Sequence, residues 1–236
     1  MADQIRIAAS ALARAPPAPK GPRAPESELG SIFETEYADA VAAAAEGRTV
    51  SPRDQILRAA LRAGREVDLT AYLADLQREV ESLPFRRAPG ALELLRGLRA
   101  DGYRLAVISN TVGEPGAFVR PTLTRMGFDD WVEGYIFSDE FPWAKPAPEI
   151  FRTALDRIGS VAGAAVHVGD GWSDMEGARR AGYRSGILFT GLQEYGERYR
   201  ALFASSARHV DPSTPRVERL EEIAPLVREL LPLGRS

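Results

Sequence analysis

Polar residues that could handle a phosphate group follow three separate apolar stretches of the chain. They are Ser109 with Asn110, then Lys145, and finally Asp170 with Asp174. Hydroxyl and amide groups donate hydrogen bonds to phosphoryl oxygens, an ammonium group offsets their charge, and carboxylates hold Mg²⁺ through hard oxygen ligands. Asp170 and Asp174 are four residues apart at the start of a predicted helix, so both can face the same point. These side-chain types together predict a site that holds a phosphate group beside a divalent cation.

Taken singly, each of these residues also has a purely structural explanation. Ser109 and Asn110 could form a turn or cap the next helix, and Asp170 could cap the helix that follows it. Lys145 could be an ordinary surface lysine, and Asp174 could be a first-turn carboxylate that the helix dipole favours. The prediction of a shared site therefore depends on whether the fold brings these residues together.

The elements that must position them are short apolar strands alternating with helices. Strands are predicted at 104–110, 134–138, 164–170 and 185–190, with a weak fifth strand at 207–211, and helices at 91–100, 117–126, 148–158, 174–181, 194–203 and 216–231. Strands without polar alternation that are separated by helices indicate a parallel sheet covered on both faces. Right-handed crossovers bring the carboxyl ends of such strands to one edge, where ligands bind. The sequence predicts a Rossmann-like α/β core with its site at that edge.

Two further parts precede this core. The first, 1–26, is rich in alanine and proline between positions 11 and 25, which predicts an extended, solvent-exposed arm. The second, 27–87, has helical spacing of its apolar residues and no strand pattern, and Ser51 followed by Pro52 is typical of a helix start. The predicted organisation is an arm at 1–26, a helical unit at 27–87 and the α/β core at 88–236.

Composition excludes several classes of function. The 236 residues carry 30 basic and 33 acidic side chains, a net charge of −3, which provides no basic surface for nucleic acid or anionic lipid. There is no cysteine for a disulfide or a thiolate site, and no apolar run approaches the roughly 18 to 20 residues that span a bilayer. His167 lies within a predicted strand and is expected to pack in the core. We expect a soluble, cytoplasmic protein without nucleic-acid or membrane partners.

The order of the motifs resembles that of the haloacid dehalogenase (HAD) superfamily. Ser109-Asn110 is followed by Lys-Pro-Ala-Pro-Glu-Ile-Phe at 145–151 and by Val-Gly-Asp-x-x-x-Asp-x-x-Gly-Ala from position 168. The resemblance covers roughly 27–231 and implies that the helical unit at 27–87 is an α-helical cap inserted into the core. We call this unit the cap from here on.

The resemblance also implies a role for each site residue. Ser109 would bind the phosphoryl group, with Asn110 beside it on the substrate, and Lys145 would orient the nucleophile and the phosphate. Asp170 would ligate Mg²⁺, and Asp174 would be a nearby or second carboxylate of the metal site. The implied function is Mg²⁺-dependent hydrolysis of a small phosphorylated metabolite selected by the cap. A metal-independent 2-haloacid dehalogenase is the alternative within the family, and a homodimer is left open.

One motif of the family is missing from the chain. The family's first motif is an apolar strand ending in Asp-x-Asp, in which the first aspartate attacks phosphorus and the second protonates the leaving group. Asp3 is the only aspartate ahead of the cap, and no strand pattern precedes it. The best substitute is the segment 4–10, which would place Ser10 and Leu12 at the aspartate positions. Because this strand is central to the family's sheet, its loss implies an apolar slot between its neighbours.

Three explanations of the missing motif stay open at the level of sequence. The chain is an enzyme of the family whose first segment is absent or replaced. Alternatively, it is a catalytically inactive pseudo-phosphatase that binds a phosphorylated ligand without turning it over. In the third explanation, the missing strand is supplied by a partner chain or by residues 4–10.

Overall fold

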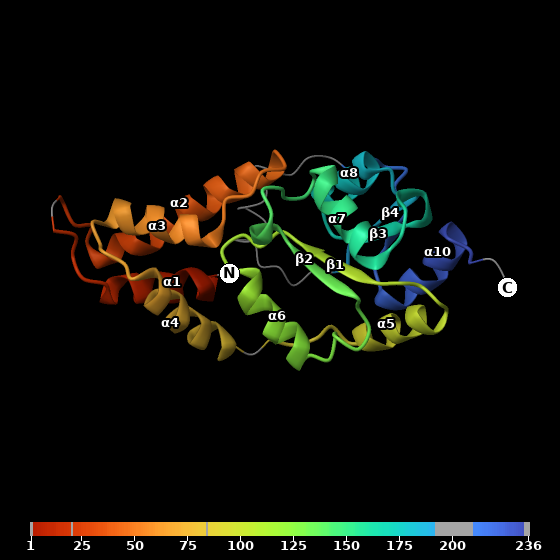
Figure 1. The fold of residues 1–236 in the computed structure, drawn as a ribbon, viewed down its shortest axis with the longest axis horizontal. Coiled ribbons are helices and arrows are strands. Elements are labelled where there is room, and N and C mark those ends of the chain that lie inside the picture. Colours follow the sequence, from red (N-terminus) through yellow and green to blue (C-terminus); the bar gives the residue numbers. More distant parts are fainter. Residues whose placement is uncertain (1, 20, 84, 192–209, 234–236) are drawn as a thin grey trace.

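The computed structural model describes residues 2–19, 21–83, 85–191 and 210–233. A group of helices lies at one end of the molecule, and two small sheets with their covering helices lie at the other (Figure 1). The α-helices are α1 (Ala2–Arg14), α2 (Glu26–Ala45), α3 (Pro52–Ala63), α4 (Leu69–Glu81), α5 (Ala91–Ala100), α6 (Gly116–Arg125), α7 (Pro148–Ile158), α8 (Trp172–Ala181) and α10 (Ile223–Leu230). The strands are β1 (Ala106–Ser109), β2 (Gly134–Phe137), β3 (Val166–Gly169), β4 (Ser185–Phe189) and β5 (Arg216–Val217), and short 3₁₀ turns cover Ser138–Glu140, Ala162–Ala164 and Leu220–Glu222. No described helix is long and apolar enough to cross a bilayer.

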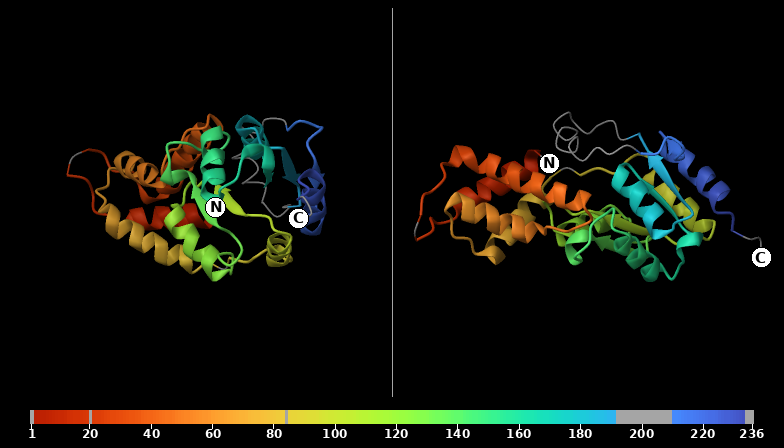
Figure 2. Two further views of the ribbon diagram at one scale, coloured as in Figure 1. Left: turned by 45° about the vertical axis from the view of Figure 1, so that its right-hand side comes forward. Right: turned by 90° about the horizontal axis from the view of Figure 1, so that it is seen from above.

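The strands are parallel and form two sheets. β1 pairs with β2, while β4 lies between β3 and β5 in the second sheet. α7 and α8 cover one face, and α5 and α10 pack against the other face of the second sheet (Figures 1 and 2). The predicted parallel α/β core is confirmed, and its four main strands lie where the apolar runs placed them.

The carboxyl-terminal part differs from the prediction. Arg216 and Val217 pair with β4 as strand β5, so the predicted helix at 216–231 begins only at Ile223. Backbone pairing to β4 takes precedence there over the helical pattern. The predicted helix at 194–203 and most of the predicted strand at 207–211 lie outside the described residues.

The expectation of an extended arm is wrong for residues 2–14, which form α1. Ile7, Ala8, Ala11 and Leu12 recur at helical spacing and are buried against the cap, with Leu12 fully enclosed. The prolines that exclude a helix begin only at Pro16, so burial of this apolar stripe favours a helix over residues 2–14. The structure therefore also contradicts the suggestion that residues 4–10 supply the missing strand. The arm, cap and core boundaries themselves stay a prediction.

The helix start expected at Ser51 and Pro52 is confirmed. Ser51 accepts a hydrogen bond from the Asp54 backbone N–H at the start of α3, where Pro52 occupies the first turn. Asp68 caps α4 in the same way. Apolar side chains of α1 to α4 share one cluster, which also takes in Phe118 of α6. The cap therefore packs against α6 of the core.

A second connection between cap and core lies next to the predicted site. In the loop after α2, Gly47 accepts a backbone hydrogen bond from Ala144 at 3.0 Å. Thr49 donates its backbone N–H to Pro142 O at 3.2 Å and its hydroxyl to Ser138 O at 3.0 Å. Gly47 has a φ of 81°, a left-handed conformation that favours glycine. This loop holds the segment that leads into Lys145.

Candidate functional site

The carboxyl end of β1 is tied to Lys145 by a reciprocal pair of hydrogen bonds. The Asn110 side-chain amide donates to Lys145 O at 3.0 Å, and Lys145 N donates to Asn110 Oδ1 at 2.7 Å. Ser109, the last residue of β1, is half-buried, and its hydroxyl has no hydrogen-bond partner among the described residues. Asn110 therefore positions the lysine backbone, while the Ser109 hydroxyl is available to a ligand.

The Lys145 side chain ends on Asp174. Its Nζ lies 2.6 Å from Asp174 Oδ1, and His167 Nε2 lies 2.8 Å from the same oxygen. The Gly171 backbone N–H donates to Asp174 Oδ2 at 3.3 Å. Asp174 is buried and Lys145 is half-buried, with 4% of the Asp174 side chain and 13% of the Lys145 side chain exposed. Burial alone would raise the Asp174 pKa, but Lys145 and His167 outweigh burial and hold that pKa well below its usual value.

Two local features of the sequence allow this arrangement. A Cβ at Gly169 would lie 2.3 Å from Asp174 Cγ, so only glycine lets the carboxylate pack over the end of β3. Asp174 occupies the third position of α8 and accepts a hydrogen bond from Gly171, the residue that caps this helix. The spacing Gly-Asp-Gly-x-x-Asp thus places Asp174 at the carboxyl end of β3.

Asp170 lies in a different environment. It follows β3 directly and is exposed. Partial loss of water around its carboxylate and the charge of Asp174 raise its pKa, while Lys145 acts in the opposite direction. The charges of Asp174 and Lys145 thus act on the Asp170 carboxylate in opposite directions. Asp170 is thus the more accessible carboxylate of the site.

A second polar network lies beside this one and was not expected from the sequence. Asp139 follows β2 and accepts a hydrogen bond from the Thr111 hydroxyl. Both Asp139 carboxylate oxygens lie 3.1 Å from the Gly116 N–H at the start of α6, and Thr111 N donates to Ser138 Oγ at 3.0 Å. The sequence contained one indication of this network: Asp139 lies shortly after the end of a predicted strand, as Asn110 does. The network fixes the loop that leaves Ser109.

The structure thus brings together residues from three strand ends. Asn110, Lys145 and Asp174 are linked by hydrogen bonds, and Ser109 and Asp170 adjoin them in the chain. His167 packs as expected, 5.0 Å from the Phe151 ring, but its contact with Asp174 was missed. His209 lies outside the described residues. The catalytic, substrate and metal roles assigned to these residues stay predictions.

Comparison with known proteins identifies the family. A family model described as haloacid dehalogenase-like hydrolase matches residues 7–182, about three quarters of the chain. The chain belongs to this family. The resemblance inferred from the motif order is confirmed by this match.

Several HAD relatives are phosphatases. The chain is 34% identical over 131 residues to a phosphoglycolate phosphatase of Colwellia psychrerythraea, which covers 55% of each protein. It is 39% identical over 101 residues to a glyceraldehyde 3-phosphate phosphatase of Pyrococcus abyssi, covering 42% of this chain and 41% of the relative. The chain spans about half the length of the curated relatives it matches.

Solved HAD structures share the fold. A 2-haloacid dehalogenase from Pseudomonas syringae pv. Tomato superposes with a TM-score of 0.59 at 21% identity, over 96% of this chain and 91% of the other. A HAD phosphatase from Thermococcus onnurineus gives a TM-score of 0.51 at 20% identity, over 93% and 97% of the two chains. These likenesses establish the fold of the chain, and they say nothing about its reaction.

HAD phosphatases generally use Mg²⁺, so the donor set of this chain can be tested against that ion. The described residues contain no group of three or more histidine and acidic side chains placed to hold a metal. Asp174 already accepts hydrogen bonds on both oxygens, which leaves Asp170 as the accessible carboxylate at this edge. Mg²⁺ demands near-octahedral oxygen coordination. The described residues do not form a magnesium site by themselves, and magnesium use stays a prediction.

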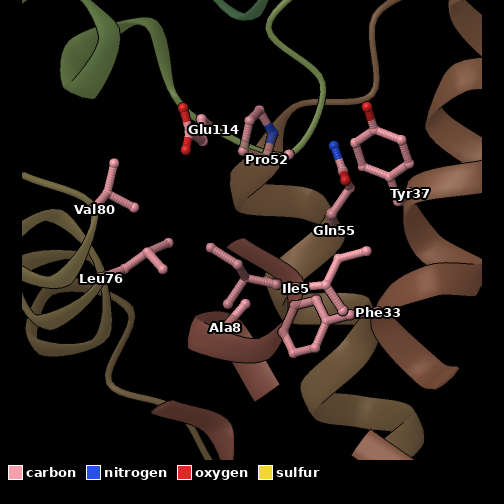
Figure 3. Close-up of a pocket in the computed structure, with 11 residues that line it drawn as sticks. Ile5, Ala8, Phe33, Tyr37, Pro52, Gln55, Leu76, Val80 and Glu114 are labelled. Carbon is pink, nitrogen blue, oxygen red and sulfur yellow. The ribbon is translucent and has the colours of Figure 1, made fainter. Parts of the chain in front are cut away.

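The helical unit at 27–87 contributes to a pocket at its boundary with the core (Figure 3). Its polar lining consists of Tyr37, Gln55 and Glu114, and the last of these lies on the loop that follows β1. Burial, followed by the charge of Glu114, raises the pKa of Tyr37 to about 12. The remaining lining residues are apolar or lack a polar side chain: Ile5, Ala8, Phe33, Pro52, Ile56, Leu76, Val80 and Gly113.

Proposed function

We propose that this HAD-like chain binds a small phosphorylated metabolite and forms the cap and phosphate-binding core of a phosphomonoester hydrolase. The observation that carries the proposal is the chain of contacts from Asn110 through Lys145 to Asp174. That chain holds an ammonium group between the carboxyl ends of β1 and β3. The relatives named as phosphatases support a phosphate monoester over a haloacid as the ligand.

Each residue has a defined task in this proposal. The Ser109 hydroxyl and backbone N–H groups of the loop after β1 donate to phosphoryl oxygens. Lys145 contributes positive charge, and Asp174 holds the ammonium group in place, since its depressed pKa keeps the carboxylate ionised. Asp170, the accessible carboxylate of the site, would contact a cation that accompanies the phosphate. The cap covers the strand ends and restricts the ligand to a small metabolite.

Hydrolysis by the family's route needs an Asp-x-Asp pair, in which one aspartate attacks phosphorus and the other protonates the leaving group. No Asp-x-Asp pair occurs anywhere in the sequence. Asp174 is buried and engaged by Lys145 and His167, and residues 4–10 belong to α1. We therefore expect the chain by itself to bind phosphate without releasing it from an ester, as in the pseudo-phosphatase explanation.

The proposal is tested by titrating the purified chain with phosphoglycolate and inorganic phosphate in a calorimeter, with Mg²⁺ present. Ser109→Ala is expected to weaken binding about tenfold, because a hydrogen bond to a charged group contributes about 1.5 kcal/mol. Ser10→Ala is the matched control, since Ser10 is exposed on α1. Absence of binding, or equal binding by the chain and Ser109→Ala, would contradict the proposal.

A further inference from the structure

The pocket at the boundary between the cap and the core is polar on one side and apolar on the other. In the view of Figure 3, Tyr37, Gln55 and Glu114 lie in the upper part, above Phe33. The apolar lining comes from four helices, since α1, α2, α3 and α4 each contribute to it. Apolar members such as Phe33 and Leu76 are at most 7% exposed. An apolar group of a ligand would therefore leave water on entering this pocket.

Gln55 presents a hydrogen-bond acceptor to the pocket. The residue is 4% exposed, and its Nε2 donates to Val50 O at 3.1 Å. Its Oε1 accepts no hydrogen bond from the described residues and is not among the fully enclosed polar atoms. An acceptor on a buried side chain costs free energy unless a water molecule or a ligand donates to it. The Gln55 oxygen therefore favours a ligand that brings a donor.

The charge on the pocket lining is negative. Glu114, which is half-buried on the loop after β1, belongs to the lining, and none of the described lining residues is basic. A carboxylate on a ligand would lose water against the apolar wall. It would also face the charge of Glu114 without a cation in the described lining to offset it. The pocket thus disfavours a second anionic group on the ligand.

The polar side of the pocket adjoins the elements that hold the candidate phosphate site. Glu114 follows Ser109 by five residues, which span at most about 18 Å of chain. Gln55 bonds to the loop in which Thr49 contacts the segment that leads into Lys145. A phosphate monoester with its phosphate at Ser109 and Lys145 can therefore place its organic group in this pocket.

We infer that the pocket holds the organic group of a phosphate monoester, and that this group is an uncharged, apolar chain ending in a hydroxyl. The hydroxyl donates to Gln55 Oε1, and the carbon chain lies against Phe33 and Leu76. Glu114 selects against esters whose organic group ends in a carboxylate. The inference rests on the proposed function, to which it adds the chemical class of the ester.

The apolar wall is tested by calorimetric titration of the full chain with inorganic phosphate and with ethyl, propyl, butyl and pentyl phosphate. Each added CH₂ is expected to tighten binding about twofold to fourfold as it leaves water. Equal binding of ethyl and pentyl phosphate by a chain that binds inorganic phosphate would overturn the inference and leave the proposed function standing. Absence of binding by inorganic phosphate and by every ester would contradict the proposed function, and the inference with it.

The selection against carboxylates is tested with 4-hydroxybutyl phosphate and 3-carboxypropyl phosphate, whose chains are equally long. The hydroxyl ester is expected to bind at least about tenfold more tightly, and Glu114→Gln is expected to reduce this preference at least about threefold. Glu93→Gln is the matched control, because Glu93 is exposed on α5 and does not line the pocket. Equal preferences in the two variants, or tighter binding of the carboxylate ester by the original chain, would overturn the inference.

The contact with the hydroxyl is tested with Gln55→Leu, which removes the acceptor and keeps a side chain of similar size. Affinity for 4-hydroxybutyl phosphate is expected to fall about fivefold, because one hydrogen bond is lost, while affinity for pentyl phosphate stays within about twofold. Gln77→Leu is the matched control, since Gln77 bonds within α4, to Glu81, and does not line the pocket. Equal losses for both esters in Gln55→Leu would show that Gln55 only supports the fold and would contradict the proposed contact.

Discussion

The cap and the core are built from similar residues, yet they are enclosed to different degrees. Among the described residues, fourteen buried side chains of α1, of the cap helices α2 to α4 and of α6 form one continuous cluster. The described core is divided into two clusters of six buried side chains, one on each side of its two separate sheets. A helical bundle encloses itself from local segments, whereas a parallel sheet needs every strand in place. The comparison shows one continuous helical cluster attached to a core whose described strands form two separate sheets.

The largest expected loss of stability comes from breaking the ion pair between Lys145 and Asp174, which links the carboxyl ends of β1 and β3. Asp174→Ala leaves the Lys145 ammonium group buried without its partner, and we expect a loss of about 3–5 kcal/mol in the free energy of unfolding. Urea unfolding followed by circular dichroism measures the loss. Asp170→Ala is the matched control, since Asp170 is exposed, and its expected change is within about 0.5 kcal/mol. Equal losses in both variants would show that the buried pair does not hold the core.

The next effect tests whether α1 belongs to the cap. Leu12→Ala removes a fully buried side chain, so a loss of about 2–5 kcal/mol in the free energy of unfolding is expected. Ser10→Ala on the exposed side of the same helix is expected to stay within about 0.5 kcal/mol of the original chain. If Leu12→Ala unfolds at the same urea concentration as the original chain, α1 does not complete the cap.

Lowering the pH is a milder way to weaken the ion pair between Lys145 and Asp174. The folded-state pKa of Asp174 is depressed below the unfolded value of about 3.9, so its contribution is present above that pH and declines as the pH falls through the folded pKa. We expect the stability of Asp174→Asn to decrease less on acidification below about pH 4 than that of the original chain. Urea unfolding at a series of pH values measures this difference. Parallel pH profiles for the two proteins would contradict the assignment.

The smallest effect concerns the contact between cap and core. Thr49→Val removes the hydroxyl that donates to Ser138 O, and a loss of about 1 kcal/mol in the free energy of unfolding is expected. Thr35→Val is the control of the same chemistry, because Thr35 is exposed and its hydroxyl donates within α2, to Ser31 O. A larger loss at Thr35 than at Thr49 would mean that the loop after α2 does not connect the two regions.

Much of the fold could be predicted because its signals are local. Ser51 and Pro52 mark the start of α3, and the apolar runs around Val107 and Val168 mark β1 and β3. The helix at Ala2–Arg14 was missed because the proline content after position 15 was extended to the whole segment, although burial of Leu12 favours a helix. β5 was missed because two residues that pair with β4 carry no pattern of their own.

The sequence by itself determined which residue types stand at the strand ends, since Ser109, Lys145 and Asp170 follow apolar runs whose parallel pairing brings them to one edge. It also determined that no Asp-x-Asp pair is available. Only the tertiary structure decided that Asp174 is engaged by Lys145 and His167 while Asp170 stays accessible. Only the tertiary structure showed that the described strands form two separate sheets. Burial and pairing depend on what distant segments cover, and local spacing along the chain contains no such information.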